Sequence, residues 1–221
     1  MKTLLIIPAY NEQDNIDLLI KDVTSYGYDY LVINDCSKDN TAEILDKNQY
    51  NHLDLPINVG IAGVTQIGFK YACDNDYDCV VNIDGDGQHQ PCYINDLIKE
   101  VENGCDYVVG SRFVTEKKPY SMRMIGSRII CFVIKLKTGK SISDPTSGMR
   151  ALGKRVITKF SKSMNFYAEP DALSYLLKKG YKVKEVQVEM KDRSGGVSYF
   201  HNPLKSIYYM MAVILSILFA Q

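Results

Sequence analysis

The sequence predicts an α/β fold: a mostly parallel sheet with flanking helices. Four short runs are continuously apolar, which is the pattern of strands covered on both faces, and they span residues 4–7, 30–33, 80–83 and 107–109. Between them lie stretches with helical character at 15–25, 41–47, 61–73 and 91–103. Repeated strand–helix units imply a sheet that binds its ligands at the carboxyl ends of the strands.

Two of these helices carry start signals. Asn40 precedes the helix at 41–47 and Glu43 follows three residues later, which is the spacing of a capping box. Pro91 suits the first turn of the helix at 91–103, where a backbone N–H has no partner to lose.

The second half of the chain is less regular. We expect an amphipathic helix at 120–137, a short strand at 147–152, a helix at 169–179 and a late strand over 183–190. After Pro203, residues 207–220 contain no charge. The sequence therefore predicts one domain over 1–200 and a C-terminal apolar helix over 201–221.

The bulk composition is that of a globular protein. The 221 residues are 46% hydrophobic and 24% charged, which excludes a disordered chain. With 26 basic and 26 acidic side chains, nothing in the net charge indicates binding to nucleic acid. Residues 112–140, however, hold eight Lys or Arg and a single acid, so a local positive surface is expected there.

The cysteines and the N-terminus indicate a cytosolic environment. Six scattered cysteines without a CxxC pair predict free thiols rather than disulfides or a zinc site. The apolar run at 4–7 is too short for a signal peptide.

The most informative segment is Asp-Gly-Asp-Gly-Gln at 84–88, directly after an apolar run. Two carboxylates, Asp84 and Asp86, at a strand end suit a hard divalent cation and the phosphates that it neutralises. An ordinary acidic turn has the same composition, so the segment alone leaves both interpretations open. We expect the adjacent His89 to be an exposed loop residue rather than a metal ligand.

Polar clusters also follow the first two strands, at 8–12 (Pro-Ala-Tyr-Asn-Glu) and 34–37 (Asn-Asp-Cys-Ser). With 84–88, three such clusters should meet at one edge of the sheet. Together with Asp-Pro-Thr-Ser-Gly-Met-Arg at 144–150, their order and spacing resemble the family 2 glycosyltransferases. The most similar subgroup is the dolichyl-phosphate mannose synthase-like enzymes, which use polyprenyl-phosphate acceptors and have a GT-A fold. The resemblance runs from Leu5 to about Ser198.

The resemblance implies that the base and ribose of a nucleotide-sugar donor bind along Pro8, Ala9, Tyr10, Glu12 and Asp35. An aromatic ring such as Tyr10 can stack on a base, and carboxylates can accept hydrogen bonds from base N–H groups or ribose hydroxyls. Simple packing is the alternative for Tyr10, but its place at a strand end favours nucleotide contact.

The resemblance also assigns Asp84, Asp86 and Gln88 to Mg²⁺ or Mn²⁺ bound to the donor diphosphate, where the ion offsets charge on the leaving group. Asp86 is the expected direct ligand and catalytic residue, and Asp84 could instead hold the sugar or ribose. Arg193, in a glycine-rich loop, would close over the diphosphate.

Three residues correspond to the acceptor-phosphate site of the family. Arg112 follows the strand at 107–109, and Arg123 and Ser127 share one face of the helix at 120–137. Guanidinium groups bind phosphate oxygens bidentately. A solvated basic face is the alternative, but the apolar residues interleaved with these cations favour a helix lying on an anionic membrane.

Asp144 and Glu169 are the remaining acidic candidates. Asp144 corresponds to a family residue that faces the sugar or acceptor and is a candidate base. Because a phosphate monoester is already an anion, Asp144 could orient groups rather than remove a proton, and a turn aspartate before proline is the structural alternative. Glu169 aligns with a family acid near the acceptor.

The expected function is inverting transfer of a sugar from a UDP- or GDP-sugar to polyprenyl phosphate, on the cytoplasmic face of a bacterial plasma membrane. Residues 207–220 fall short of the ~20 needed to span a bilayer, so we expect an interfacial helix, or one docked on a membrane partner protein or a second copy; core packing is the alternative. Two other functions stay open: transfer to a saccharide acceptor, with Glu169 or Asp144 as an essential base, and an inactive subunit that recruits membrane partners.

Overall fold

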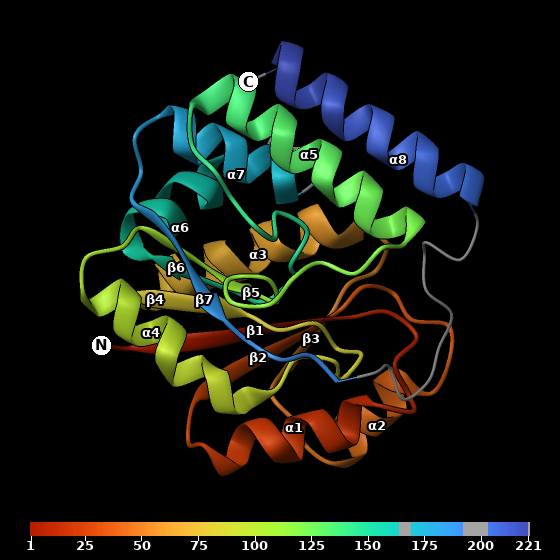
Figure 1. Ribbon diagram of the computed structural model, residues 1–221. Coiled ribbons are helices and arrows are strands. Elements are labelled where there is room, and N and C mark those ends of the chain that lie inside the picture. Colours follow the sequence, from red (N-terminus) through yellow and green to blue (C-terminus); the bar gives the residue numbers. More distant parts are fainter. Residues whose placement is uncertain (164–168, 192–202, 221) are drawn as a thin grey trace.

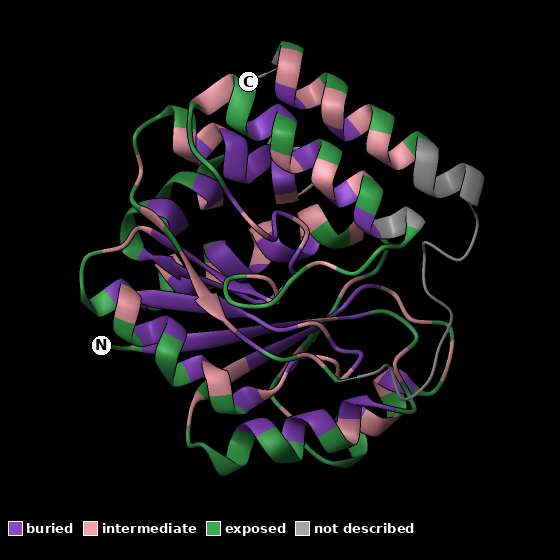
Figure 2. Ribbon diagram, in the orientation of Figure 1, coloured by how far each residue is buried: buried purple, intermediate pink, exposed green. Residues whose placement is uncertain are grey.

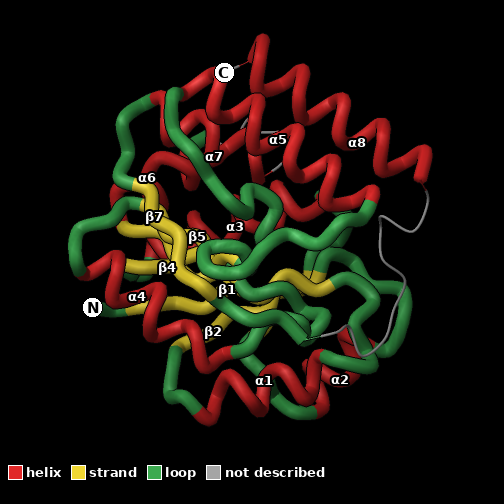
Figure 3. Tube along the Cα trace, in the orientation of Figure 1, coloured by secondary structure: helices red, strands yellow, loops and turns green. Residues whose placement is uncertain are grey.

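The computed structural model of the chain describes residues 1–163, 169–191 and 203–220, with the backbone alone for 122–123, 203–207 and 220. One sheet lies between two layers of helices (Figures 1 and 3). Its strands are β1 (Thr3–Ala9), β2 (Asp29–Asn34), β3 (His52–Asp54), β4 (Cys79–Asn82), β5 (Tyr107–Ser111), β6 (Arg150–Gly153) and β7 (Val183–Gln187). The helices are α1 (Ile16–Ser25), α2 (Thr41–Lys47), α3 (Gly60–Asp74), α4 (Ile94–Glu102), α5 (Met122–Thr138), α6 (Lys154–Lys162), α7 (Glu169–Lys178) and α8 (Pro203–Leu215), with a 3₁₀ turn at Pro91–Tyr93 and a π-helical end at Ser216–Ala220.

The sheet has the strand order β3-β2-β1-β4-β6-β5-β7. All neighbouring pairs are parallel except those of β6, which runs antiparallel to both β4 and β5. The α/β class and the mostly parallel sheet are therefore confirmed. The carboxyl ends of β1, β2, β4 and β5 all lie at one edge, because β6 is the single described strand that reverses direction.

The continuously apolar strands are explained by burial on both faces (Figure 2). Along β1, Leu5 and Ile7 pack with α1 and α4 on one side, whereas Leu4 and Ile6 pack with α3, α6 and α7 on the other. Each of these four side chains is at most 1% exposed. Two hydrophobic cores, one on each face, thus hold the strands whose ends carry the candidate site.

Several local predictions are wrong. The strand β3 and the helix α6 were not anticipated, and the late strand ends at Gln187, after which Met190 makes only an isolated bridge to His89. The capping box at Asn40 is absent from the described contacts of α2. Instead, the Asp39 carboxylate accepts the Thr41 N–H at 3.0 Å, one residue earlier in the chain.

A third apolar cluster joins α5 to the C-terminal helix. Ile130, Val133 and Ile134 of α5 pack against Val213 and Ile217, and Figure 1 shows α5 and α8 side by side. The opposite side of α5 carries four exposed apolar residues, called here the outer stripe: Ile125, Ile129, Phe132 and Leu136. In the described ranges, no helix combines the length and the apolar character needed to span a membrane.

Close packing of α3 on β1 depends on Gly68. A methyl group added at Gly68 would lie 2.5 Å from Cδ1 of Ile6, which is fully buried. We expect Gly68→Ala to lower the free energy of unfolding by about 1 kcal/mol, because an overpacking cost of about 1–3 kcal/mol exceeds a helix-propensity gain of about 1 kcal/mol. Urea denaturation measures this.

The control is a double-mutant cycle with Ile6→Val, which removes the clashing Cδ1. The two substitutions together should be less destabilising than the sum of the singles by at least about 0.5 kcal/mol. Additive effects would show that this contact does not limit the packing of α3.

Candidate active site

The polar segments predicted to converge do lie at one edge of the sheet. Residues 8–12 span the carboxyl end of β1, and residues 35–37, residues 84–88 and Arg112 follow the carboxyl ends of β2, β4 and β5. The segments are in direct contact: the Asp35 N–H donates to the Ala9 carbonyl at 2.9 Å, and a methyl group at Gly85 would lie 2.8 Å from the Pro8 carbonyl oxygen. The parallel register therefore builds one continuous rim.

The end of β2 is tied to the start of α3 by Asp35. Its carboxylate accepts the N–H groups of Val59 and Gly60, at 2.7 and 2.9 Å. Gly60 has φ +73°, a conformation that glycine adopts without strain. Because Asp35 is 5% exposed and occupied by these donors, its first role is to fix the turn beside the predicted donor site.

The rim before α1 presents an accessible aromatic ring. Tyr10 is 44% exposed, so simple packing does not account for it. The Glu12 backbone N–H donates to Thr41 Oγ1 at 2.9 Å, and its carboxylate accepts from Asn15 Nδ2 at 3.0 Å. These bonds anchor the loop while leaving the Tyr10 ring facing solvent, as stacking on a base requires.

The two carboxylates of the acidic turn after β4 differ in their exposure to solvent. Asp86 is 5% exposed and its Oδ1 accepts the Gln88 N–H at 3.0 Å, whereas the Asp84 side chain is 44% exposed. Gln88 Nε2 donates to the Lys191 carbonyl at 3.3 Å. Two carboxylates on one turn form the oxygen-rich donor set that Mg²⁺ or Mn²⁺ prefers, so the residues present fit such an ion.

His89 is buried, and its prediction as an exposed loop residue is wrong. It is 3% exposed, and its Nδ1 accepts the backbone N–H of Asp84 at 3.0 Å. The imidazole packs against the acidic turn, with Nε2 at 3.8 Å from Asp84 Oδ2. His89 therefore supports the turn rather than facing solvent.

The electrostatics of the turn centre on Asp84. Surrounding protein atoms desolvate its charged form and raise the pKa of the carboxyl group, and the nearby charges of Asp86 and Glu169 raise it further, against the opposing effects of His89 and Arg150. The side chain still faces the open side of the rim, so solvent screens part of this effect. A bound cation would relieve the same repulsion.

A second cluster of possible metal ligands lies at the edge of the sheet, between α2 and β3. His52 Nε2 is 3.4 Å from carboxylate oxygens of both Asp46 and Asp54, and its Nδ1 faces the Tyr50 carbonyl oxygen at 2.8 Å. These residues belong to α2 and β3, not to the acidic turn where the sequence predicted the metal.

The strongest ion pair of the rim joins Arg112 to Asp144. Nε and Nη2 of Arg112 donate to the two carboxylate oxygens at 2.7 and 2.8 Å, and the Arg112 backbone N–H adds a bond at 3.2 Å. Asp144 is fully buried, and its backbone N–H donates to Glu185 at 2.8 Å. The Asp144 carboxylate therefore holds the guanidinium of Arg112 in a defined orientation.

A cationic pocket lies next to this pair. It has a volume of about 470 Å³ and is open to solvent, and its lining comprises Phe113, Glu116, Lys117, Lys118, Tyr120, Arg128, Cys131, Ile142 and Ser143. The Lys118 ammonium donates to Oγ of the buried Ser127 at 2.9 Å and lies 5.4 Å from the centre of the Phe113 ring. Arg112 lies 5.2 Å from the centre of the same ring, so its guanidinium is close to one of the residues that line the pocket.

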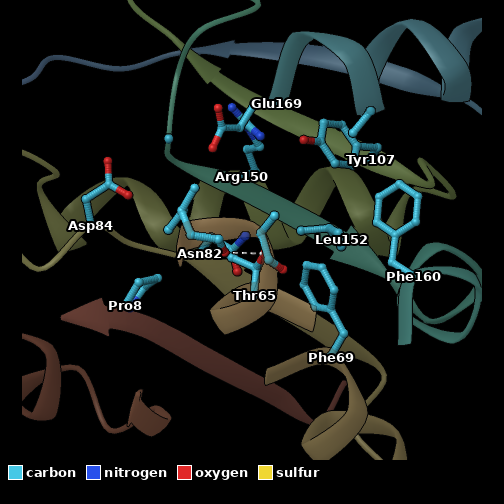
Figure 4. Close-up of a pocket in the computed structure, with 14 residues that line it drawn as sticks. Pro8, Thr65, Phe69, Asn82, Asp84, Tyr107, Arg150, Leu152, Phe160 and Glu169 are labelled. Atoms are coloured by element: carbon cyan, nitrogen blue, oxygen red, sulfur yellow. Dashed lines mark hydrogen bonds between the residues drawn. The ribbon is translucent and has the colours of Figure 1, made fainter. Parts of the chain in front are cut away.

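Two predicted residues cannot be placed. Arg123 belongs to α5, but its side chain lies outside the described part of the structure, and Arg193 falls in the segment 192–202, which is also outside it. Glu169 begins α7 and lines an inner pocket together with Asp84 and Arg150 (Figure 4).

Sequence reasoning missed Lys118 and Arg150. Arg150 is 6% exposed and donates to the Ser147 carbonyl. Burial opposes its charge, but Tyr107 and Glu169 more than offset this, so that the pKa of Arg150 is raised and the guanidinium stays charged. Its position at the end of the 144–150 segment was a usable signal; Lys118 had none beyond belonging to a basic stretch.

We expect Arg112→Ala to lower the free energy of unfolding by about 3–5 kcal/mol, because the buried Asp144 charge loses its partner. Arg112→Lys should lie between Arg112→Ala and the unchanged protein, since an ammonium cannot form the two parallel bonds. Urea denaturation reports both. Adding Asp144→Asn to Arg112→Ala should recover part of the loss; a further, additive loss would contradict the pairing.

The raised pKa of Asp84 predicts a pH-dependent gain in stability on neutralisation. A carboxyl group with a raised pKa in the folded state destabilises the fold where it is ionised, and this penalty disappears as the pH falls towards the unfolded value of about 3.9. At pH 7, Asp84→Asn should raise Tm by on the order of 1–2 °C, and the gain should vanish near pH 4. Asp22→Asn, at an exposed site on α1, is the matched control; a pH-independent gain would contradict this origin.

Comparisons with known proteins agree with this arrangement. Residues 4–160 match the family model described as glycosyl transferase family 2. The chain is 31% identical over 182 residues to a UDP-N-acetylglucosamine–dolichyl-phosphate N-acetylglucosaminyltransferase of Methanococcus voltae, covering 72% of each chain. It is 27% identical over 212 residues to a polyprenol monophosphomannose synthase of Mycolicibacterium smegmatis, covering 89% of this chain and 80% of that protein.

The fold is also found in solved structures. Glucosyl-3-phosphoglycerate synthase from Mycobacterium tuberculosis, in complex with Mn²⁺, UDP-glucose and phosphoglyceric acid, superimposes with a TM-score of 0.74 at 17% identity, covering 98% of this chain and 78% of that one. The family match spans most of the chain and includes both the first strand end and the acidic turn. The chain therefore belongs to glycosyl transferase family 2.

Proposed function

We propose that this chain transfers a sugar from a nucleoside-diphosphate sugar to polyprenyl phosphate, with a divalent cation and with inversion at the anomeric carbon. The observation that carries the proposal is the placement of an acidic turn and a cationic pocket along one edge of the sheet. An exposed apolar helix face lies beside the pocket. Each part matches the chemistry of one reactant or of the membrane that holds the acceptor.

On the donor side, the diphosphate would lie at the acidic turn. Asp86 and Asp84 would hold Mg²⁺ or Mn²⁺ with support from Gln88, and the ion would supply charge neutralisation for the diphosphate. Tyr10 would stack on the base, and Glu12 and the Asp35 turn would shape its pocket. The presence of Mn²⁺ and UDP-glucose in the mycobacterial synthase of the same fold is consistent with this assignment.

On the acceptor side, the lipid phosphate would bind in the cationic pocket. Lys118 lines it, and Arg112 lies against the ring of Phe113, another lining residue, so two cations held by neighbours would be available to one phosphate. Preorganised cations of this kind stabilise charge without rearrangement during the reaction. Ser127, which accepts a hydrogen bond from Lys118, would fix the position of the ammonium group, and we retain Arg123 as a further phosphate ligand.

The spacing of the strands supports direct displacement. Because β6 lies between β4 and β5, the acidic turn and Arg112 emerge from strands about 10 Å apart, twice the usual inter-strand distance. A sugar would fit between the two reactant phosphates. An acceptor phosphate oxygen would attack the anomeric carbon of the donor sugar. The bond between this carbon and the diphosphate oxygen would break at the same time, and its electron pair would leave with the nucleoside diphosphate. Catalysis would depend on positioning.

Lipid anchoring would explain the outer stripe of α5. Its four exposed apolar residues alternate with Arg128, Lys135 and Lys137, which is the composition of a helix lying in an anionic membrane surface. We place the protein on the cytoplasmic face of a membrane, with residues 201–221 as a C-terminal helix added to a domain at 1–200. Proteins to which the chain is similar are named as dolichyl- and polyprenol-phosphate transferases.

Transfer to a saccharide acceptor is less well supported. That reaction requires a base to deprotonate a hydroxyl group. Of the two candidates, the Asp144 carboxylate is fully buried and bonded to Arg112, which leaves Glu169, a residue of the inner pocket, to supply the base. A phosphate acceptor needs no such base.

The test is transfer of radiolabel from UDP- and GDP-sugars to undecaprenyl phosphate with Mn²⁺, followed in the organic extract. Asp86→Asn should lower kcat by about 10²-fold or more, as loss of charge stabilisation does. Lys118→Ala should raise KM for undecaprenyl phosphate by about tenfold, because the loss of one hydrogen bond to a charged group weakens binding by about that factor. Lys162→Ala, at an exposed site on α6, is the control.

Label appearing only in soluble glycans would contradict the lipid acceptor while leaving the enzyme class intact. Full activity of Asp86→Asn in chelator would contradict the cation assignment.

A further inference from the structure

An inner pocket extends from the acidic turn into the space between the sheet and α3. Its volume is about 50 Å³. Figure 4 shows Asp84 and Pro8 at one end, and Phe69 and Phe160 at the other. The polar end thus adjoins the proposed donor site, whereas the far end is a wall of buried apolar side chains.

The polar end contains an acceptor that lacks a partner. Asn82 is 8% exposed, and its Oδ1 has no hydrogen-bond partner among the residues that the structure describes. The neighbouring Thr65 hydroxyl donates to the carbonyls of Ile61 and Ala62, at 2.9 and 3.1 Å. A buried acceptor without a donor is costly to keep, so this atom points to a ligand with an N–H or O–H group.

A donor faces the same space. Arg150, 6% exposed, lines the pocket and stays charged, as its contacts with Tyr107 and Glu169 show. Figure 4 places Arg150 and Asn82 on the same side of the pocket, away from the two phenylalanines. The pocket therefore offers one hydrogen-bond acceptor, one cationic donor and an apolar wall.

The size selects among sugar substituents. A cavity needs a volume of roughly 10–15 Å³ to hold one water molecule. The inner pocket, with about 50 Å³, therefore has room for roughly three to five non-hydrogen atoms. An acetamido group, with one nitrogen, one oxygen and two carbons, meets this size. A lone hydroxyl group would leave the apolar end of the pocket unfilled.

We propose that the donor sugar carries an acetamido group and that this group enters the inner pocket. The amide N–H donates to Asn82 Oδ1, the amide carbonyl accepts from Arg150, and the methyl group packs towards Phe69. The inference rests on the proposed function, because it specifies the donor of that same site.

A carboxylate substituent fits less well. It would pair with Arg150 but would meet the Asn82 oxygen and the charges of Asp84 and Glu169, which face the same pocket. It also lacks the methyl group that the apolar wall requires. An amide is neutral, donates one hydrogen bond and accepts another, and so matches both polar residues.

The test measures donor binding by calorimetry, with Mn²⁺ and without any lipid acceptor. UDP-N-acetylglucosamine should bind at least about tenfold more tightly than UDP-glucose, because one additional group that fits its pocket gives a discrimination of about tenfold or more. It should also bind more tightly than UDP-glucuronate or GDP-mannose. Equal binding of UDP-glucose, or preference for either of the last two donors, would overturn the inference.

Two variants locate the preference. Asn82→Ala should lower the preference for the acetamido sugar about tenfold while leaving UDP-glucose binding unchanged. Ala62→Leu, which fills the pocket from the side of α3 with a purely apolar group, should exclude the acetamido sugar and retain UDP-glucose. Asn95→Ala, at an exposed asparagine of α4, should behave as the unchanged protein. A preference that survives in Ala62→Leu would overturn the inference even if Asn82→Ala fails to fold.

These outcomes separate the two proposals. Nucleotide-sugar binding or transfer without an acetamido preference leaves the proposed function intact and rejects the pocket assignment. Failure of every nucleotide sugar to bind would reject both.

Discussion

The buried pair of Arg112 and Asp144 is the interaction on which the proposed acceptor side of the rim depends. A carboxylate without solvent contact must be compensated fully, and Asp144 receives a bidentate guanidinium, a backbone N–H and a hydroxyl. The pair joins the loop after β5 to the loop before β6. Neither loop is part of the sheet, so the ion pair holds them together. In this way an electrostatic requirement of the interior fixes the position of a guanidinium at the surface.

The proposed donor side follows the opposite arrangement. There the Asp84 side chain is partly exposed, and desolvation by the surrounding protein, together with the nearby charges of Asp86 and Glu169, raises the pKa of its carboxyl group. Supporting groups such as His89 and the Asp35 carboxylate satisfy backbone N–H groups and hold the turns in place. The backbone of these turns is thus well bonded, while the Asp84 side chain remains partly exposed. Supporting hydrogen bonds of this kind hold a binding site in a defined geometry.

The sequence predicted the sheet because its physical cause is local. A strand buried on both faces is apolar on both, without alternation, and the interiors of β1 and β4 have that pattern. The strand β3 has only three residues, two of them exposed, so its composition carries no comparable signal. The helix α6 did carry one, since Val156, Ile157 and Phe160 recur at helical spacing and are buried, but its short length and flanking lysines obscured it.

The sequence predicted which types of residue form the site, but it did not predict which of these side chains contact one another. Strand-end motifs marked Asp84, Asp86 and Arg112 from sequence, because parallel strands bring their ends together. The partnership of Arg112 with Asp144 spans 32 residues, and that of Lys118 with Ser127 depends on how a loop lies against α5. The burial of His89 was equally hidden, since a polar residue after a glycine-rich turn gives no local indication of which way it points.

The antiparallel insertion of β6 has a consequence for how this scaffold can diversify. The inner pocket is lined by residues of α3, of the strands β1, β4, β5 and β6, and of α6 and α7, whereas the cationic pocket is lined by the loop after β5, by α5 and by the loop before β6. The described residues that line one do not line the other. If the two pockets have the roles proposed here, substitutions on α3 would alter which activated sugar is accepted without altering lipid recognition, and changes on α5 would do the reverse. Each specificity would then evolve or be engineered independently of the other.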